Sequence, residues 1–411
     1  MNEARRGWLI VGALSVTVTV GYGVLQYAFG VLLPAMHHDL GWSRTEITGA
    51  FSLAVLVSAV AGLPIGVLLD RRSPRLLMTG GAAAAAVLVA AWSRVHTIVE
   101  LYLVFAALGV AMASLLYEAA FTVIAKWLSS RRRAALTAIT VVGATASLIF
   151  SPLTHQLEAA LGWRDALLVL AGILAAVAIP LNALALRRRP RELEPPPGEA
   201  GPAPRQVLRS VSFWLLATAF MLGSFSTFAI VVLLVSLLIH EGSGAAFAAF
   251  VAGLLGFSQL PGRLVLGMVG RRLSKRALPV AVFGLGAAAL VLLACDRSGW
   301  AAIVFAIVFG ASNGMSTLLR ATMVAELWGR DSYGALLAAL SAPFNLARAA
   351  APVLGSVLVA VTGSYRSLLW VLAAGTAAAA AAGAAAVTRQ RDHPARAADG
   401  PQRNTPVWPS E

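Results

Sequence analysis

Long apolar runs constrain this 411-residue chain more than any other feature of its sequence. A helix needs about 20 apolar residues to cross a hydrocarbon core about 30 Å thick. Twelve runs reach this length, at residues 8–33, 43–69, 75–93, 97–125, 134–160, 164–186, 211–239, 245–270, 276–295, 299–325, 332–361 and 366–387. Runs this long exclude membrane strands, so we predict an all-α integral membrane protein with twelve transmembrane helices in a lipid bilayer.

Charge supports this prediction and orients the chain. Only 12% of the residues are charged, too few to cover a water-soluble domain of this size. Connections on the side of the N-terminus carry 24 Lys and Arg residues, and those on the other side carry five. The bias predicts two cytoplasmic termini, in a multi-pass protein of the plasma membrane such as the bacterial inner membrane. Because the net charge of +14 lies at helix ends, it does not indicate a nucleic-acid partner.

The chain also repeats itself at about half its length. Arg71 and Arg72, which follow the second run, return 200 residues later as Arg271 and Arg272. Such an offset is typical of a duplicated six-helix unit, so we predict two pseudo-symmetric halves. The predicted parts are an N-terminal bundle at 1–186, an extended Pro-rich cytoplasmic linker at 187–208, a C-terminal bundle at 209–388 and a disordered cytoplasmic tail at 389–411.

A short motif, GVLLDRR at residues 66–72, follows the second run. It resembles the G-x-x-x-D-R/K signature of the major facilitator superfamily, and GMVGRR at 267–272 resembles a degenerate copy after the eighth run. The resemblance covers the whole chain and implies the twelve-helix fold of these transporters. In the family the Asp caps a neighbouring helix end and pairs with basic loop residues, which implies a gating role for Asp70, Arg71 and Arg72. The alternative is that these charges only anchor the topology.

Four ionisable side chains fall well inside the runs: Glu118, Arg263, Arg320 and Arg348. Each costs at least roughly 2.5–3.5 kcal/mol at mid-membrane, so we expect them to face a cavity or each other. Three cations against one anion leave a surplus that an anionic substrate would neutralise. Guanidinium suits this task because it holds a carboxylate with two parallel hydrogen bonds.

Polar and aromatic residues accompany these charges at helical spacing. Gln259 precedes Arg263 by one turn, Asn345 precedes Arg348 by one turn, and Tyr117 adjoins Glu118. The predicted substrate-binding residues are Arg263, Arg348, Gln259, Asn345, Tyr117, Asn313, Tyr22 and Gln26. The alternative for such polar stripes is that they join helices to one another.

The pair Gln259 and Arg263 in the eighth run is similar to an arrangement in monocarboxylate transporters. There an Asp and an Arg share this spacing, and the Arg holds the substrate carboxylate. Arg263 matches, and the resemblance makes it the main anion-binding residue, but Gln259 replaces the acid and leaves that pair without its proton relay. Arg348 adds a second cation, in the eleventh run. This placement resembles that in the oxalate:formate antiporters, which hold a dicarboxylate with basic residues in the eighth and eleventh runs.

Glu118 and Arg320 occupy equivalent positions in the fourth and tenth runs, so a pseudo-twofold would bring them face to face. They form either a gate or proton-coupled ion pair, or a static buried pair.

We predict a secondary transporter of a small organic anion, a mono- or dicarboxylate, driven by protons or a counter-substrate and acting as a monomer. It should be no enzyme, because no catalytic dyad or nucleotide-binding loop is visible, and it should need no cofactor. The single Cys295 has no metal-ligand partner nearby, so no metal site is expected. One alternative is a drug or metabolite efflux antiporter, although the fifth run keeps only a remnant of the G-x-x-x-G-P-x-x-G-G motif of that class. The other is a non-transporting membrane sensor.

Overall fold

The computed structural model describes residues 3–128, 132–187, 203–270, 272–329 and 332–392, and no strand occurs in these ranges. The first half of the chain contains α1 (Glu3–Tyr22), the π-helix η1 (Gly23–Tyr27), α2 (Ala28–Leu40), α3 (Arg44–Arg71), α4 (Pro74–Trp92), α5 (Ile98–Leu115), α6 (Tyr117–Trp127), α7 (Arg132–Ala144) and α8 (Ala146–Ala185). The second half contains α10 (Val211–His240), α11 (Ala245–Val269), α12 (Ala277–Cys295), α13 (Gly299–Trp328), α14 (Tyr333–Thr362) and α15 (Tyr365–Asp392).

Eleven helical stretches in the described residues are long and apolar enough to cross a membrane. The longest, Arg132–Ala185, has 54 residues and contains Gly162, whose φ of 80° and ψ of 163° are not helical. At about 1.5 Å per residue this stretch measures about 80 Å, more than twice the thickness of a hydrocarbon core. The chain turns back at Gly162, so the stretch crosses twice and the total is twelve. The prediction of a twelve-helix fold is confirmed.

Local sequence signals begin and end these helices. Ser43 and Glu46 form a reciprocal capping box at the start of α3, and Thr97 and Glu100 form another at the start of α5. Each box satisfies two backbone N–H groups that the first helical turn leaves unpaired. Gly363 ends α14 in the left-handed conformation, at φ 65°, which glycine adopts without steric cost. Caps of this kind explain why the predicted and observed boundaries differ by only a few residues at most helix ends.

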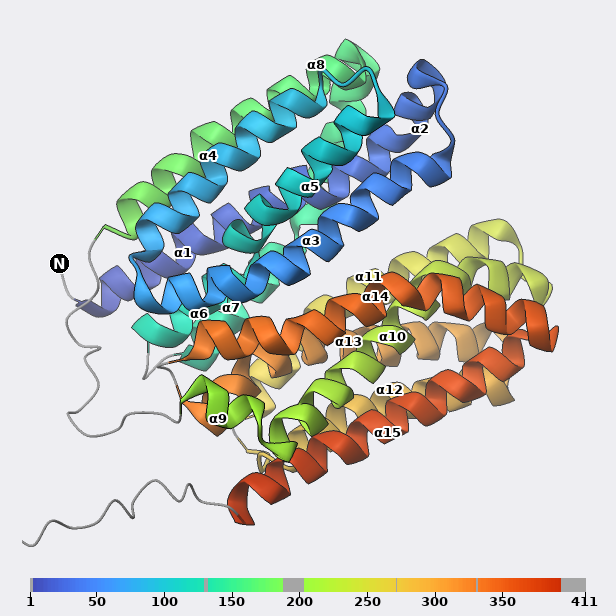
Figure 1. The fold of residues 1–411 in the computed structure, drawn as a ribbon. Coiled ribbons are helices and arrows are strands. Elements are labelled where there is room, and N and C mark those ends of the chain that lie inside the picture. The colour runs from blue at the N-terminus through green and yellow to red at the C-terminus, as the bar shows by residue number, and fades with distance from the viewer. Residues whose placement is uncertain (1–2, 129–131, 188–202, 271, 330–331, 393–411) are drawn as a thin grey trace, which may run out of the picture.

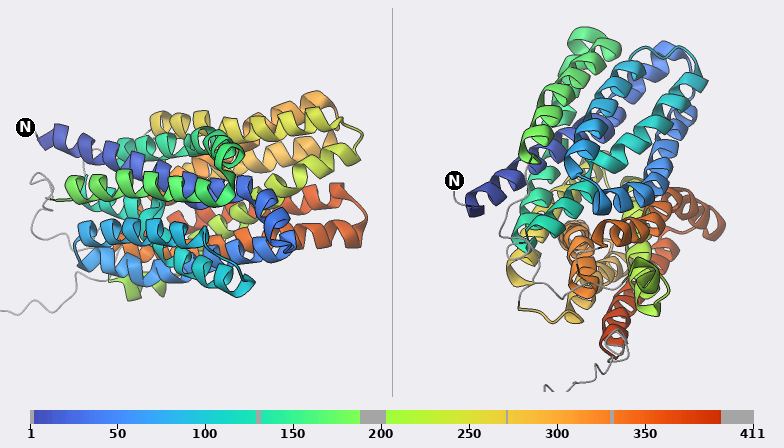
Figure 2. Two further views of the ribbon diagram at one scale, coloured as in Figure 1. Left: turned by 90° about the horizontal axis from the view of Figure 1, so that it is seen from above. Right: turned by 60° about the vertical axis from the view of Figure 1, so that its left-hand side comes forward.

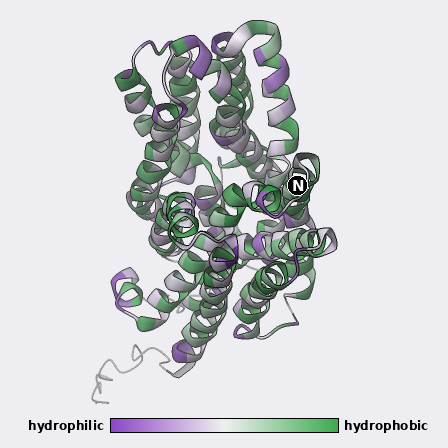
Figure 3. Cartoon of the chain, turned by 90° about the vertical axis from the view of Figure 1, so that its right-hand side faces the viewer, coloured by the Kyte–Doolittle hydropathy of each residue, from purple (hydrophilic) through white to green (hydrophobic). Residues whose placement is uncertain are grey.

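The two halves form two helical bundles that lie side by side, with their helices along a common direction (Figures 1 and 2). The start of α1 and the end of α15 lie at the same end of the molecule, here called the terminal end; the opposite end is the distal end. Hydrophobic residues recur along all the helices (Figure 3), and many of them are exposed; Leu76, Leu103 and Val361 are 77%, 65% and 81% exposed. Such an apolar surface suits contact with lipid.

Buried side chains join the halves at the terminal end. One hydrophobic cluster there contains Phe121 from the first half and Phe213 and Leu319 from the second. Toward the distal end the core divides into two separate clusters, one around Trp92 and one around Phe305. The ribbons of the two halves accordingly diverge toward the distal end (Figure 1). The molecule is therefore in a conformation that is closed at its terminal end.

The segment between the halves differs in part from its prediction. Residues 188–202 of the predicted linker lie outside the described residues, but Pro204–Leu208 form the short helix α9 where the sequence predicted extended chain. Proline fits the first position of a helix because its fixed φ is helical and no hydrogen-bonded N–H is needed there. The predicted tail also begins later than residue 389, since α15 continues to Asp392. Residues 393–411 of that tail lie outside the described residues.

Candidate functional site

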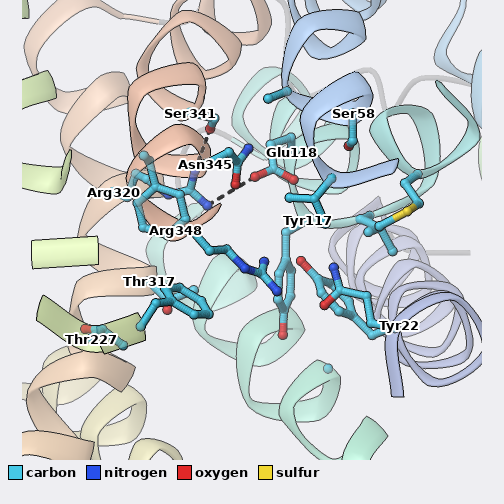
Figure 4. A pocket seen from close by; sticks show the side chains of 18 of the residues that line it. Tyr22, Ser58, Tyr117, Glu118, Thr227, Thr317, Arg320, Ser341, Asn345 and Arg348 are labelled. Atoms are coloured by element: carbon cyan, nitrogen blue, oxygen red, sulfur yellow. Dashed lines mark hydrogen bonds and ion pairs between the residues drawn. The ribbon is translucent and has the colours of Figure 1, made fainter. Parts of the chain in front are cut away.

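A cavity of about 450 Å³ lies between the two halves, and both halves supply its walls. It lies at mid-length of its lining helices, since Tyr22 falls in the middle of the first span and Arg348 in the middle of α14. All eight predicted substrate-binding residues line this cavity: Tyr22, Gln26, Tyr117, Gln259, Arg263, Asn313, Asn345 and Arg348. Glu118 and Arg320 line it as well, so the structure brings the four membrane-embedded charges into one chamber. Figure 4 shows three of them, Glu118, Arg320 and Arg348.

Arg320 of α13 meets Glu118 of α6 across the boundary between the halves. Its Nη2 lies 3.1 Å from Oε1 of Glu118, and its Nη1 donates a hydrogen bond to the hydroxyl of Ser341 (Figure 4). The guanidinium also stacks on Phe344, with its central carbon 4.3 Å from the ring centroid. Arg320 is thus neutralised and hydrogen-bonded, whereas the Glu118 side chain keeps 28% of its surface exposed and faces the cavity.

Arg263 of α11 also bridges the two halves, but without an acid. Its Nη1 donates a hydrogen bond to the backbone carbonyl of Thr140 in α7. The hydroxyl of Tyr117 donates to the same carbonyl oxygen at 3.3 Å. The Nε of Arg263 has no acceptor, although the residue is only 6% exposed. Such a buried donor is costly to leave unpaired, so this guanidinium keeps capacity for an additional acceptor.

Arg348 of α14 has the least constrained charge in the cavity. Its guanidinium carbon lies 4.5 Å from the ring centroid of Phe228. Within the described part of the chain this guanidinium forms no ion pair or hydrogen bond. The residue is half-buried, and its head group points toward Tyr117 and Tyr22 of the other half (Figure 4). Arg348 therefore presents its donors to the cavity itself.

A π-helical turn shapes one wall of the cavity. In the segment Gly23–Tyr27, the N–H of Ala28 bonds to the carbonyl of Gly23, five residues earlier. An α-helix would place Tyr27 about 140° around the axis from Tyr22, since each residue turns about 100°. The wider π turn brings Tyr22, Gln26 and Tyr27 to the cavity together. The sequence predicted an uninterrupted run here, and π turns of this kind are frequent at functional sites.

Two more lining helices are interrupted beside the cavity. The fourth span breaks at Leu116, between α5 and α6, and the fifth breaks at Thr145, between α7 and α8. The ring of Phe150, from α8, packs so closely on the π turn that a Cβ atom on Gly23 would lie 2.2 Å from it. Interrupted helices at mid-membrane are a common way for transporters to build a substrate site.

Asp70 lies outside the cavity and joins the halves at the terminal end. Its carboxylate accepts hydrogen bonds from the backbone N–H groups of Gly334, at 3.2 Å, and Ala335, at 2.9 Å. These groups belong to the first turn of α14, whose dipole favours a negative charge at this position. Lys126, at the end of α6, lies 3.2 Å from the same carboxylate. Asp70 thus ties α3, α6 and α14 together.

The backbones of α3 and α14 touch beside Asp70. A Cβ atom on Gly66 would lie 2.4 Å from the carbonyl oxygen of Gly334, and one on Gly334 would lie 2.6 Å from that of Gly66. Only residues without a side chain allow this approach. One turn farther from the end, a Cβ on Gly62 would lie 4.0 Å from the Cβ of Ala338, an ordinary contact.

The other two residues of the motif lie differently. The side chains of Arg71 and Arg72 are exposed and make no hydrogen bond or ion pair with any part of the chain that the structure describes. A second connection between the halves is formed by Arg133 of α7 and Glu326 of α13, which make an ion pair. The ammonium group of Lys275 donates to the backbone carbonyl of Glu326 at 2.9 Å.

Sequence reasoning did not single out Lys126, Arg133 or Glu326. Lys126 and Arg133 were considered only as charges that set the topology. A usable signal was present, because Lys126 and Glu326 lie 200 residues apart and so repeat a position with opposite charge. The Thr140 carbonyl had no such signal, since a backbone acceptor looks the same at every position. In the described ranges, no three His, Cys, Asp or Glu residues come together as a metal ion would require.

Comparison with known proteins decides the family. A sequence profile described as Major Facilitator Superfamily matches residues 15–295 and 274–409. The chain belongs to the major facilitator superfamily. Its fold agrees with that of another superfamily transporter, FucP, solved in an outward conformation. The two structures share a TM-score of 0.71 at 14% identity, over 91% of this chain and 97% of FucP.

Several relatives of this superfamily member are named transporters. Mouse monocarboxylate transporter 11 is 27% identical over 364 residues, which cover 87% of this chain and 74% of the relative. Rat monocarboxylate transporter 4 is 24% identical over 384 residues, which cover 88% of this chain and 78% of the relative. An uncharacterized 38 kDa protein of Thermoproteus tenax is 25% identical over 390 residues, covering 88% and 98%. The predicted resemblance to monocarboxylate transporters is confirmed at low identity, and the chain is a transporter rather than an enzyme.

Proposed function

We propose that this transporter moves a small organic anion bearing a carboxylate, by alternating access of the central cavity to the two sides of the membrane. One observation carries the proposal: three guanidinium groups and a single carboxylate line one chamber, among the residues described. The surplus of two positive charges at mid-membrane favours an anionic substrate. The names of the mouse and rat relatives agree with a carboxylate.

The two arginines without an acidic partner, Arg348 and Arg263, would act in succession. Arg348 is open to the cavity and makes the first contact with the carboxylate. Arg263 is the main anion-binding residue, and its Nη1 must be shared with the Thr140 carbonyl. Because a carboxylate is a stronger acceptor than a neutral carbonyl, a substrate held by Arg263 weakens this contact between the halves. Binding thereby loosens the terminal closure and allows the cavity to open on the other side.

Glu118 supplies a route for coupling. It is the only carboxylate in the described lining of the cavity, and its pair with Arg320 joins the halves. Protonation of Glu118 would leave Arg320 with Ser341 alone, so α6 and α13 would be held together less strongly. A proton gradient could then drive the cycle. A counter-substrate that occupies the same cavity on the return step is the alternative source of energy.

The distribution of basic residues makes the terminal end cytoplasmic in this proposal. The described inter-half ion pairs and hydrogen bonds then lie on the cytoplasmic side, and the conformation seen here faces outward. We place the transporter in a plasma membrane, as the inner membrane of a bacterium, where it acts as a monomer.

Cysteine labelling tests this orientation. In a Cys295→Ser background, a Ser73→Cys variant at the terminal end should not react with a membrane-impermeant maleimide in intact cells and should react after permeabilisation. An Arg94→Cys variant in the same background places the thiol on an exposed loop at the distal end and should react at once. The opposite labelling pattern would invert the proposed topology.

Replacement of Arg348 tests the anion site. Hydrogen bonds to charged groups contribute about 1.5–3 kcal/mol, so Arg348→Gln should weaken carboxylate binding by at least about tenfold. Arg348→Lys keeps the charge but not the planar fork, so its carboxylate affinity should lie between those of the wild type and Arg348→Gln. Thermal stabilisation of the purified protein by acetate, lactate, benzoate and succinate measures the effect. Arg366→Gln, which removes an exposed arginine outside the cavity, is the matched control.

Two outcomes would count against the anion proposal. Wild-type carboxylate affinity in the Arg348→Gln protein would assign the substrate to other groups. Stabilisation by lipophilic cations, with no response to any carboxylate, would favour the efflux antiporter.

A further inference from the structure

The cavity contains more aromatic surface and more volume than a very small anion needs. We infer that the substrate is a monocarboxylate with an aromatic or comparably large apolar body, of about 10–15 non-hydrogen atoms. The inference rests on the proposed carboxylate transport and concerns the part of the substrate beyond its charge. Three features support it: the number of available cations, the aromatic walls and the cavity volume.

The cations indicate a single charge on the entering substrate. Arg320 is paired with Glu118 and Ser341, and Arg263 is bound to the Thr140 carbonyl. Arg348 is the cavity guanidinium that has neither kind of partner in the described chain. A second carboxylate would have to compete with the Thr140 carbonyl for a guanidinium that is only 6% exposed. In this conformation one anionic group is therefore matched and a second is not.

Aromatic rings surround the place where Arg348 would hold that group. Phe228 lies beneath its guanidinium, and the rings of Tyr22 and Tyr117 face it from the other half, with their centroids 4.7 Å apart (Figure 4). Phe344 lies beneath Arg320. These rings come from four helices, two in each half, and they favour a planar apolar body over a bare hydrated anion.

The volume agrees with such a body. A cavity of about 450 Å³ corresponds to roughly fifteen water molecules at about 30 Å³ each. Acetate or lactate would leave most of the aromatic wall in contact with water. Little apolar surface would then be buried, and the gain in binding free energy would be small. The remaining polar lining includes the amides of Gln26, Asn313 and Asn345, which can bind a hydroxyl or amino substituent but cannot neutralise another anionic group.

Binding measurements on the purified full-length protein test the inference. We expect phenylacetate and indole-3-acetate to bind at least tenfold more tightly than acetate or lactate. They should also bind more tightly than phenylacetamide, which has the same ring without the charge, and than phenylmalonate, which has the ring with two charges. Isothermal titration in detergent gives all these affinities under one condition.

A pair of phenylalanine variants tests the role of the walls. An aromatic contact gives about a two- to tenfold gain in affinity, so Phe228→Leu should reduce the preference for phenylacetate over acetate by about this factor. Phe250→Leu is the matched control, because Phe250 is 57% exposed on the outside of α11 and does not line the cavity. It should leave the preference unchanged.

The results separate this inference from the proposed function. Equal affinities for acetate and phenylacetate, both lost in Arg348→Gln, would overturn the aromatic-body inference and leave carboxylate transport standing. Tighter binding of phenylmalonate than of phenylacetate would overturn the single-charge argument in the same way. Failure of every carboxylate to bind would overturn the proposal of carboxylate transport itself.

Discussion

An Arg263→Ala transporter should reach the membrane in normal amounts and lose at least about a hundredfold in carboxylate transport. The substitution removes a guanidinium that could give two charge-assisted hydrogen bonds, each contributing about 1.5–3 kcal/mol, and every 1.4 kcal/mol is about tenfold. It also removes the contact with the Thr140 carbonyl. Folding should survive because an incompletely paired buried cation is itself unfavourable. Uptake into proteoliposomes measures the loss of transport, and binding in detergent measures the loss of substrate affinity.

The charge and the geometry of Arg263 can be separated. Arg263→Lys keeps the cation but loses the planar fork, so we expect weak binding and slow transport rather than none. Arg272→Ala removes an exposed arginine just beyond the same helix and should change neither quantity. If the Arg263→Ala protein folds and still binds its substrate with wild-type affinity, Arg263 is a structural contact and not part of the anion site.

Asp70→Asn should lower the maximal transport rate by about tenfold or more while changing substrate affinity less than about twofold. The carboxylate holds two N–H groups of α14 and the ammonium of Lys126, and charge-assisted hydrogen bonds of this kind contribute about 1.5–3 kcal/mol each. Asparagine has one acceptor oxygen and no charge. The closed terminal end is therefore destabilised relative to the open one, and the return step slows.

The control for Asp70 is the same substitution at Asp39. Asp39 accepts from Trp163 and pairs with Arg164 inside the first half, at the distal end. Asp39→Asn therefore removes a similar set of contacts without touching the boundary between the halves, and its transport rate should stay near that of the wild type. Equal losses of rate and affinity in Asp70→Asn would show that the residue supports the cavity rather than the conformational change.

The fold was predictable because it depends on properties that each segment carries by itself. Apolar length predicted the twelve helices, and capping residues such as Ser43 and Thr97 lie next to the observed starts. The interruptions at η1, Leu116 and Thr145 were not predictable. They depend on contacts between helices, such as Phe150 on Gly23, and an apolar run has the same composition whether it is an α-helix or contains a π turn.

The candidate site was predictable as a set of residues but not as an arrangement. The cost of a buried charge identifies Arg263 and Arg348 from the sequence alone. Which of them is free depends on the register of α11 against α7, and this register decides that the Thr140 carbonyl meets one and not the other. The partner of Asp70 was hidden in the same way, since Lys126 becomes its neighbour only when α3 and α6 pack together.

The connections at the terminal end divide their charges unequally between the halves. In one, the first half supplies both Asp70 and Lys126 and the second supplies backbone N–H groups; in the other, Arg133 of the first half meets Glu326 of the second. Two copies of the first half, placed about the same pseudo-twofold axis, would bring Arg133 to Lys126, a like charge that Asp70 already pairs, and leave Arg133 without the acid that Glu326 supplies. The interacting surfaces of the two duplicated bundles have therefore become complementary to each other and are no longer interchangeable. Expressed as separate polypeptides, they should assemble as a heterodimer in preference to either homodimer.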